Sequence, residues 1–152
     1  MRSCDPVTGE AAGSPAVAAR RVVSLNLRAG PDAARTARRV VCRAFRDRVP
    51  DVVLADAQLL VSELVTNSVR HGGLHPEECV HVDAGIADGV LRIEVADPGT
   101  AGTVAPRAPD MGGGGGFGLR IVASVSRAWG IHRDGQTRVW AELTCPAKPK
   151  LA

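Results

Sequence analysis

The sequence is poor in aromatic residues. Its 152 residues include no Tyr, two Phe and two Trp, although 45% of them are hydrophobic. A core must therefore be packed from Val, Leu, Ile and Ala, and a protein that stacks nucleic-acid bases on aromatic rings is disfavoured. The length fits one domain, and the hydrophobic content excludes a chain that is disordered throughout.

Closely spaced cysteines and long hydrophobic runs are also missing. The four cysteines include no pair spaced as in a CxxC redox motif or a zinc knuckle, so we expect reduced thiols. No uninterrupted apolar run reaches the roughly 18 residues of a membrane span. We therefore expect a cytoplasmic protein with no membrane attachment. Three histidines and Cys79 crowd into residues 71–81, but their spacing fits no closed zinc site, and we expect them to decorate a loop and the start of a strand.

Lysine is almost absent, and arginine is concentrated near the N-terminal end. The formal net charge is only +3, yet residues 20–48 hold nine Arg against Asp32 and Asp47, which is about +7 by count. A solvated helix face explains such a run, and an acidic partner or a phosphate backbone is the alternative.

Hydrophobic periodicity predicts the order of the elements. Alternating apolar residues predict strands at 23–27, 80–86, 91–97, 129–132 and 137–143, and spacings of three and four predict helices at 33–45, 51–71 and 119–125. Asp88-Gly89 and Asp134-Gly135 are hairpin turn signals, and both Trp residues are expected in the core. Because the strands come in hairpins, we predict an α+β two-layer sandwich with a mixed or antiparallel sheet and helices on one face. The domain is expected at 21–145, between a flexible N-terminal tail at 1–20 and a C-terminal tail at 146–152.

Two polar residues interrupt the apolar pattern of the second predicted helix. Glu63 and Asn67 are four residues apart and therefore project from the same side, one turn apart. The amide oxygen of Asn67 is a hard ligand that Mg²⁺ accepts beside phosphate oxygens, and a carboxylate one turn away can hold a water or hydroxyl for attack on a phosphate. An exposed polar face is the alternative interpretation.

Two further features are candidates for ligand binding. Asp97 ends a predicted strand, where its carboxylate can accept a hydrogen bond from a ligand amino group, and Gly99 permits close approach to the backbone. Alone, this Asp-Pro-Gly segment is also an ordinary turn. The glycine run 112–116 precedes the last predicted helix, so its amides can bind phosphate, although it can also be a linker. No Lys-Ser or Lys-Thr follows the run, and no strand leads directly into it, which disfavours Walker A and dinucleotide-binding loops.

In this order, the three features resemble the ATPase superfamily that contains gyrase, Hsp90, histidine kinases and MutL. Residues 60–72 (LVSELVTNSVRHG) resemble its N box, residues 95–99 (VADPG) its first glycine box, and residues 116–122 (GFGLRIV) its second, at the ATP lid. The likeness is strongest to the small anti-sigma-factor serine kinases and their stand-alone bacterial relatives, and it extends from about Val22 to Leu143. It implies the Bergerat-type α/β sandwich.

The resemblance implies a role for each matching residue. Glu63 is implied as the catalytic base or water positioner, Asn67 as the Mg²⁺ ligand, and Asp97 as the reader of the adenine amino group. The remaining matches are implied to bind the nucleotide. Gly99 is implied as the close-approach glycine and Gly116 and Gly118 as phosphate-loop glycines, and His71, Phe117 and Leu119 complete the set.

The sequence departs from the family pattern at three places around the lid. Ala101 stands where the first box usually has a second glycine, and Phe117 stands between the lid glycines where many small relatives have Arg. Gly114 and Gly115 occupy the place where the anti-sigma kinases tend to have a basic residue. Fewer cations then face the terminal phosphate, which favours nucleotide binding over phosphotransfer; Arg107 and Arg120 are candidate substitutes.

We therefore expect a Mg-ATP-binding regulatory protein that phosphorylates a protein partner on Ser or Thr, or sequesters it. The resemblance implies a sigma factor or an anti-sigma-factor antagonist as the partner. A non-catalytic module of the same fold, which binds ATP or docks a partner through the basic helix, is the alternative. A homodimer stays open, and nucleic acid is disfavoured.

Overall fold

The computed structural model describes residues 21–98 and 117–148, so the predicted tail at 1–20 and most of the loop between Asp97 and the last helix lie outside the described residues. The five strands form one sheet in the order β1-β2-β3-β5-β4, and every neighbouring pair is antiparallel. The strands are β1 (Arg21–Arg28), β2 (Cys79–Ala87), β3 (Val90–Asp97), β4 (Ala128–Arg133) and β5 (Thr137–Thr144). The helices are α2 (Ala33–Phe45), α3 (Asp51–His71) and α4 (Phe117–Val125).

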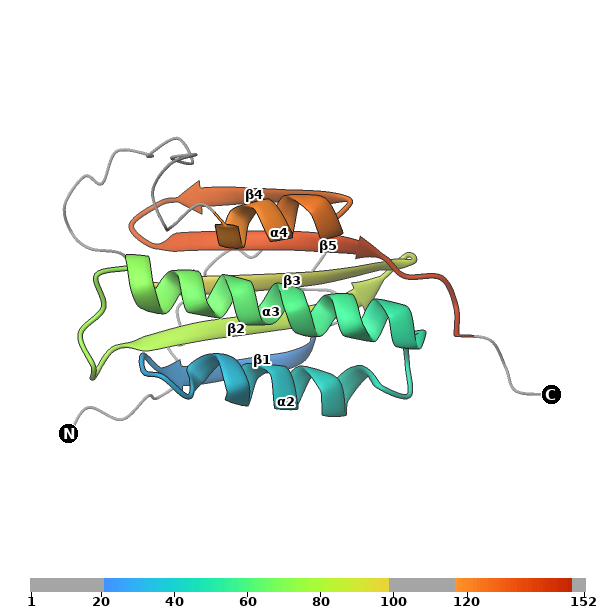
Figure 1. Ribbon diagram of the computed structural model, residues 1–152, viewed down its shortest axis with the longest axis horizontal. Helices are drawn as coiled ribbons and strands as arrows, with labels where there is room; N and C mark the ends of the chain where they lie inside the picture. The colour runs from blue at the N-terminus through green and yellow to red at the C-terminus, as the bar shows by residue number, and fades with distance from the viewer. Residues whose placement is uncertain (1–20, 99–116, 149–152) are drawn as a thin grey trace.

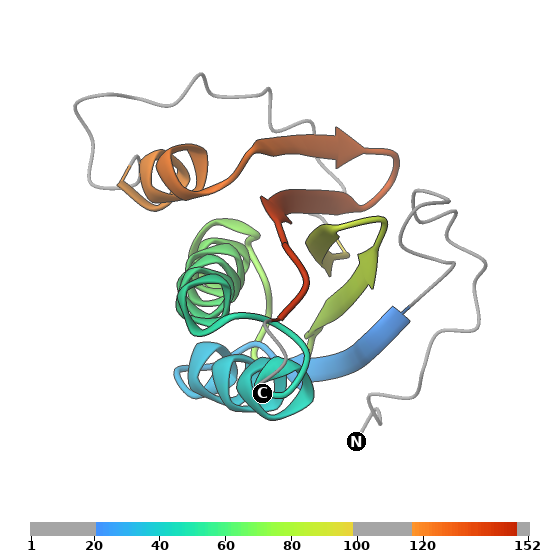
Figure 2. The same cartoon turned by 90° about the vertical axis from the view of Figure 1, so that its right-hand side faces the viewer.

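The helices form one layer and the sheet the other. Figure 1 shows α3 between α2 and α4, and Figure 2 shows all three helices on the same side of the sheet. The predicted order of elements and the α+β sandwich with helices on one face are thus confirmed. The sheet is antiparallel throughout the described residues. Short turns join β2 to β3 and β4 to β5 as hairpins, and helices lie in the connections from β1 to β2 and from β3 to β4.

The core between the layers is aliphatic, as the shortage of aromatic residues requires. Leu60 and Leu64 of α3 are buried in the same core cluster as Leu91 and Ile93 of the central strand β3, against which α3 packs. Among the described residues, Phe45 at the end of α2 is the one aromatic side chain that is fully buried. The hydrophobic face of α3 therefore spans the middle of the sheet.

Local sequence explains the ends of α3 and the turn between β2 and β3. Pro50 precedes the helix and Asp51 lies in its first turn, where a carboxylate complements the helix dipole. The Gly72 N–H donates to the Ser68 carbonyl at 2.9 Å, and Gly73 follows with a φ of 62°. The Asp88-Gly89 turn has φ values of 50° and 72°, as a two-residue hairpin requires.

Helix α3 is long and apolar enough to cross a membrane by length and composition alone. In the structure it packs against three strands and both other helices, and eight of its residues are buried. It is therefore the core helix of the sandwich.

The expectation that both Trp residues belong to the core is wrong. Trp129 lies in the edge strand β4 and is 36% exposed. Trp140 alternates with the buried Ala141 and so lies on the sheet face opposite the helices. There a Cβ at Gly130 would come within 2.9 Å of its ring, and the Arg92 guanidinium lies 4.1 Å from the ring centroid. Alternation fixed which residues share a face, but not which face the helices cover.

The face of the sheet opposite the helices carries charges that neutralise one another. Arg92 Nη1 donates to Glu142 Oε1 at 2.9 Å, and Arg92 Nη2 lies 3.6 Å from Glu94 Oε2. The three side chains are only 10 to 17% exposed. Together with Trp140 they shield one another from water, which strengthens the pairing.

The thiols are not all reduced. Cys42 and Cys145 are free, whereas Cys79 is disulfide-bonded. The expectation of reduced thiols throughout is corrected at this position, because spacing along a chain does not decide which sulfur atoms meet in space.

Asp83 of β2 lies on the face of the sheet opposite the helices, called the open face below, as Glu94 does. Its Oδ1 is 3.1 Å from His81 Nε2 and 3.2 Å from Arg21 Nε. Burial opposes ionisation, but hydrogen bonds from His81 and Ser24 and the charges of His81 and Arg21 outweigh it, so the pKa of Asp83 lies below its ordinary value of 3.8.

We expect Asp83→Asn to lower the free energy of unfolding at neutral pH by about 1 kcal/mol. Because the folded-state pKa is the lower one, this stabilisation is present above the unfolded-state pKa and is lost as pH falls through the folded-state pKa. Urea unfolding across this range measures it. Asp47→Asn is the control, since Asp47 is 89% exposed and 4.0 Å from Arg46. A difference that persists at the acid end would contradict the assignment.

Candidate functional site

The predicted pair on α3 faces α4. A Cβ built on Gly118 would lie 3.0 Å from Glu63 Oε2 and 3.2 Å from Asn67 Oδ1. Both side chains are half-buried, and within residues 21–98 and 117–148 no hydrogen bond or ion pair engages either of them. Glu63, Asn67 and Gly118 therefore meet in space, although about fifty residues separate them along the chain.

Asp97 lies near the same end of α3. It is the last residue of β3, is 4% exposed, and falls on the helix-facing side of the strand with Ile93 and Val95. A Cβ at Gly72 would lie 3.3 Å from Asp97 Oδ2 and only 2.5 Å from the Ser68 carbonyl oxygen. The small residue at the end of α3 thus lets the helix close over a buried carboxylate.

The remaining predicted residues divide into those the structure describes and those it does not. His71 is the exposed last residue of α3, one residue before Gly72. Phe117 and Leu119 lie in the first turn of α4, with Leu119 half-buried. Gly99 and Gly116 lie outside the described residues, as do Ala101 and the rest of the glycine run.

The chemistry of the donors fits a hard cation and a phosphate. Glu63 and Asn67 offer a carboxylate and an amide oxygen, which suit Mg²⁺, and a glycine beside them leaves room for a ligand to approach. The N-terminus of α4 adds a favourable dipole for anions. Among the described residues, no group of three or more His, Cys, Asp and Glu is arranged to hold a metal ion, so an ion here would share its coordination with a bound phosphate.

Two features were not identified from the sequence. Gly72 reads as a helix stop, and its contact with Asp97 depends on how α3 crosses β3. Five arginines around α2, with Cys42 and Gln58, line a groove of about 410 Å³ on the opposite side of α3 from α4. The arginine run was visible in the sequence, but it gave no indication of the part that α3 contributes.

The chain matches a known family over most of its length. Residues 27–143 match the family model of the histidine kinase-like ATPase domain, and this range spans all three helices and the sheet apart from most of β1. No curated protein sequence matched the chain. The chain therefore belongs to the histidine kinase-like ATPase domains of the gyrase, Hsp90, histidine kinase and MutL type, a family that binds ATP.

Proposed function

We propose that this protein binds Mg-ATP between α3, α4 and the end of β3 and uses it to regulate a protein partner. The observation that carries the proposal is the close approach of Gly118 to Glu63 and Asn67. Asp97 lies near the same end of α3, beside Gly72. One or more described residues of each of the three predicted motifs lie near this end of α3, which supports the proposal. In the proposal Asn67 ligates Mg²⁺, Asp97 accepts a hydrogen bond from the adenine amino group, and the start of α4 faces the phosphates.

The proposed regulatory output is phosphorylation of a Ser or Thr in the partner, as in the anti-sigma-factor kinases that the sequence resembles. Glu63 would accept the proton of the attacking hydroxyl, whose oxygen bonds to the γ-phosphorus while the bond to the bridging oxygen breaks and ADP leaves. A sigma factor or its antagonist is the proposed partner, in the cytoplasm, and a homodimer belongs to the same proposal.

The second candidate is a non-catalytic module that binds ATP and docks or sequesters its partner. Phe117 and the absence of a basic residue at 114 and 115 favour it, because a kinase needs cations near the transferred phosphate. The basic groove around α2 lies apart from the proposed nucleotide site and also favours a docking role.

The nucleotide site is tested by removing its two polar anchors. We expect Asn67→Ala and Asp97→Asn each to weaken Mg-ATP binding by roughly tenfold or more, because each change removes a hydrogen bond or ligand that involves a charged group. Isothermal titration calorimetry gives the affinities, and thermal unfolding checks the fold. Asp47→Asn should bind as the unmodified protein does, and an unmodified protein that does not bind Mg-ATP would refute the site.

The contact at α4 gives a separate test. In Gly118→Ala, the new Cβ intrudes at 3.0 Å on Glu63 and 3.2 Å on Asn67, so we expect weaker Mg-ATP binding. Thermal stability should not fall, because Ala favours a helix over Gly by up to about 1 kcal/mol. Gly30→Ala is the matched control, since nothing lies within 4 Å of its Cβ. Unchanged affinity in Gly118→Ala would separate α4 from the nucleotide.

Glu63→Gln distinguishes the kinase from the non-catalytic module. The amide keeps the size of the side chain but cannot accept the hydroxyl proton, so Mg-ATP binding should survive while transfer of labelled phosphate to a candidate partner is lost. Calorimetry and a label-transfer assay on the same samples separate the two effects. Undiminished transfer would exclude Glu63 as the base, and an unmodified protein that binds ATP without transferring label would support the non-catalytic candidate.

A further inference from the structure

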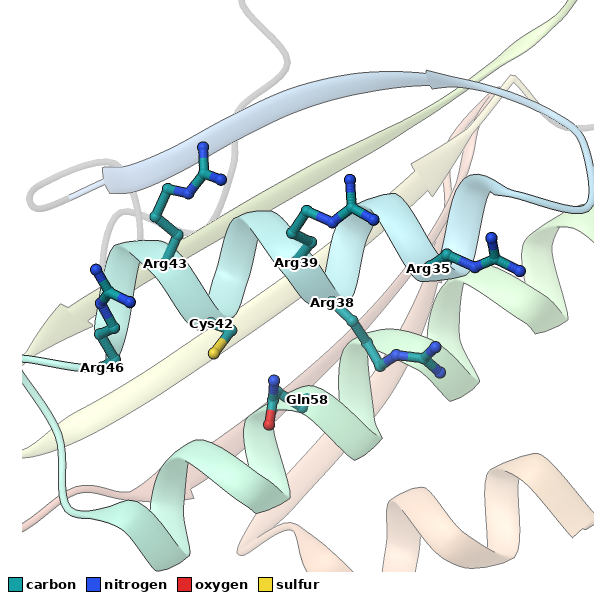
Figure 3. Close-up of a pocket in the computed structure, with 7 residues that line it drawn as sticks. All are labelled: Arg35, Arg38, Arg39, Cys42, Arg43, Arg46 and Gln58. Carbon is teal, nitrogen blue, oxygen red and sulfur yellow. The ribbon is translucent and has the colours of Figure 1, made fainter.

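The groove between α2 and α3 is lined by five arginines and by Gln58 of α3. Figure 3 shows Arg38 and Cys42 pointing toward α3 and Gln58 pointing back toward α2, while Arg39 and Arg43 extend away from α3. Arg35 and Arg46 complete the lining. From Arg35 to Arg46 the arginines span eleven residue steps, or about 16 Å along the helix axis.

Little in the described part of the chain neutralises this charge. Asp32 lies 3.8 Å from Arg35, and Asp47 lies 4.0 Å from Arg46, but all four side chains are at least 65% exposed. Ion pairs as exposed as these contribute little to stability, because solvent and salt screen them. Within residues 21–98 and 117–148, no carboxylate pairs with the central arginines Arg38, Arg39 and Arg43. The cluster thus differs from the sheet's open face, where Arg92 is paired with glutamates.

One arginine is held in place across the groove. Arg38 Nη1 donates to the Ser62 hydroxyl at 3.2 Å, and that hydroxyl donates to the Gln58 carbonyl at 2.8 Å. A guanidinium has five N–H donors, so Arg38 keeps donors for a carboxylate. Holding the side chain in advance lowers the entropy cost of binding.

The surroundings of the groove suit a protein segment better than a nucleic acid. Leu59 follows Gln58 directly and is 38% exposed, and Val52, seven residues earlier on the same side of α3, is 69% exposed. Both lie outside the groove, about 100 to 120° around α3 from Gln58, so they offer apolar contacts to a segment that continues from the groove over the outer surface of α3. None of the seven lining residues is aromatic, so no base-stacking platform lies within the groove.

We propose that the groove between α2 and α3 docks an acidic, amphipathic segment of a protein partner, with glutamate or aspartate side chains paired to the arginines. Since α2 and α4 lie on opposite sides of α3 (Figures 1 and 2), such a segment does not compete with a nucleotide near α4. The inference rests on the proposed function for the idea of a protein partner and adds the chemistry by which that partner is recognised.

The test uses the full chain and a fluorescein-labelled helical peptide, with Glu every three or four residues on one face and Leu beside it. Its control peptide has Gln in place of each Glu. By fluorescence anisotropy without ATP, we expect the Glu peptide to bind and Arg39→Glu/Arg43→Glu to weaken binding by about tenfold or more. Arg28→Glu/Arg133→Glu makes the same change of charge outside the groove and should leave the affinity unchanged. Added salt should weaken binding, because exposed charges are screened.

Three results would overturn the proposal. The first is equal binding of the Gln peptide, and the second is an equal loss in the control pair of substitutions. The third is a short DNA duplex that binds more tightly than the Glu peptide and is released by Arg39→Glu/Arg43→Glu, which would make the groove a nucleic-acid site. Calorimetry with Mg-ATP on the same proteins keeps the outcomes separate, because a failure of ATP binding leaves the peptide result standing, and the reverse also holds.

Discussion

The packing of α3 across the sheet is the interaction on which the rest of the structure depends. Leu60 and Leu64 bury one side of this 21-residue helix against the central strands. Because a helix turns once in 3.6 residues, that buried side leaves two flanks and an outer surface for other contacts. Helix α2 takes one flank and α4 the other, so the register of a single helix determines what each neighbour meets.

The two flanks of α3 carry different chemistry because different small or polar residues face the neighbouring helices. Toward α4, Gly118 has no side chain and comes close to Glu63 and Asn67. Toward α2, Ser62 is a hydrogen-bond acceptor for Arg38. Ser62 and Glu63 are adjacent in the chain and separated by about 100° around the helix. One turn of α3 therefore takes part in both proposed sites.

The two outer surfaces of the sandwich differ in whether their arginines are paired with carboxylates. On the open face of the sheet, Arg92 is paired with Glu94 and Glu142 and covers Trp140. On the helical side, Arg39 and Arg43 have no such partner among the described residues. The net charge of +3 hides this asymmetry. Arginines that are paired within the protein have little tendency to bind an acidic ligand, whereas an unneutralised cluster attracts one.

The sequence alone determined the elements, their order and the fold class, because hydrophobic periodicity and turn residues are local signals. It also selected Glu63, Asn67 and Asp97, since residues one turn apart, or at the end of a strand, have fixed directions. Only the tertiary structure decided that Gly118 lies against α3, that Trp140 lies opposite the helices, and that the arginines form a groove. These facts depend on which face of the sheet the helices cover and on how closely they approach one another, and long-range packing sets both.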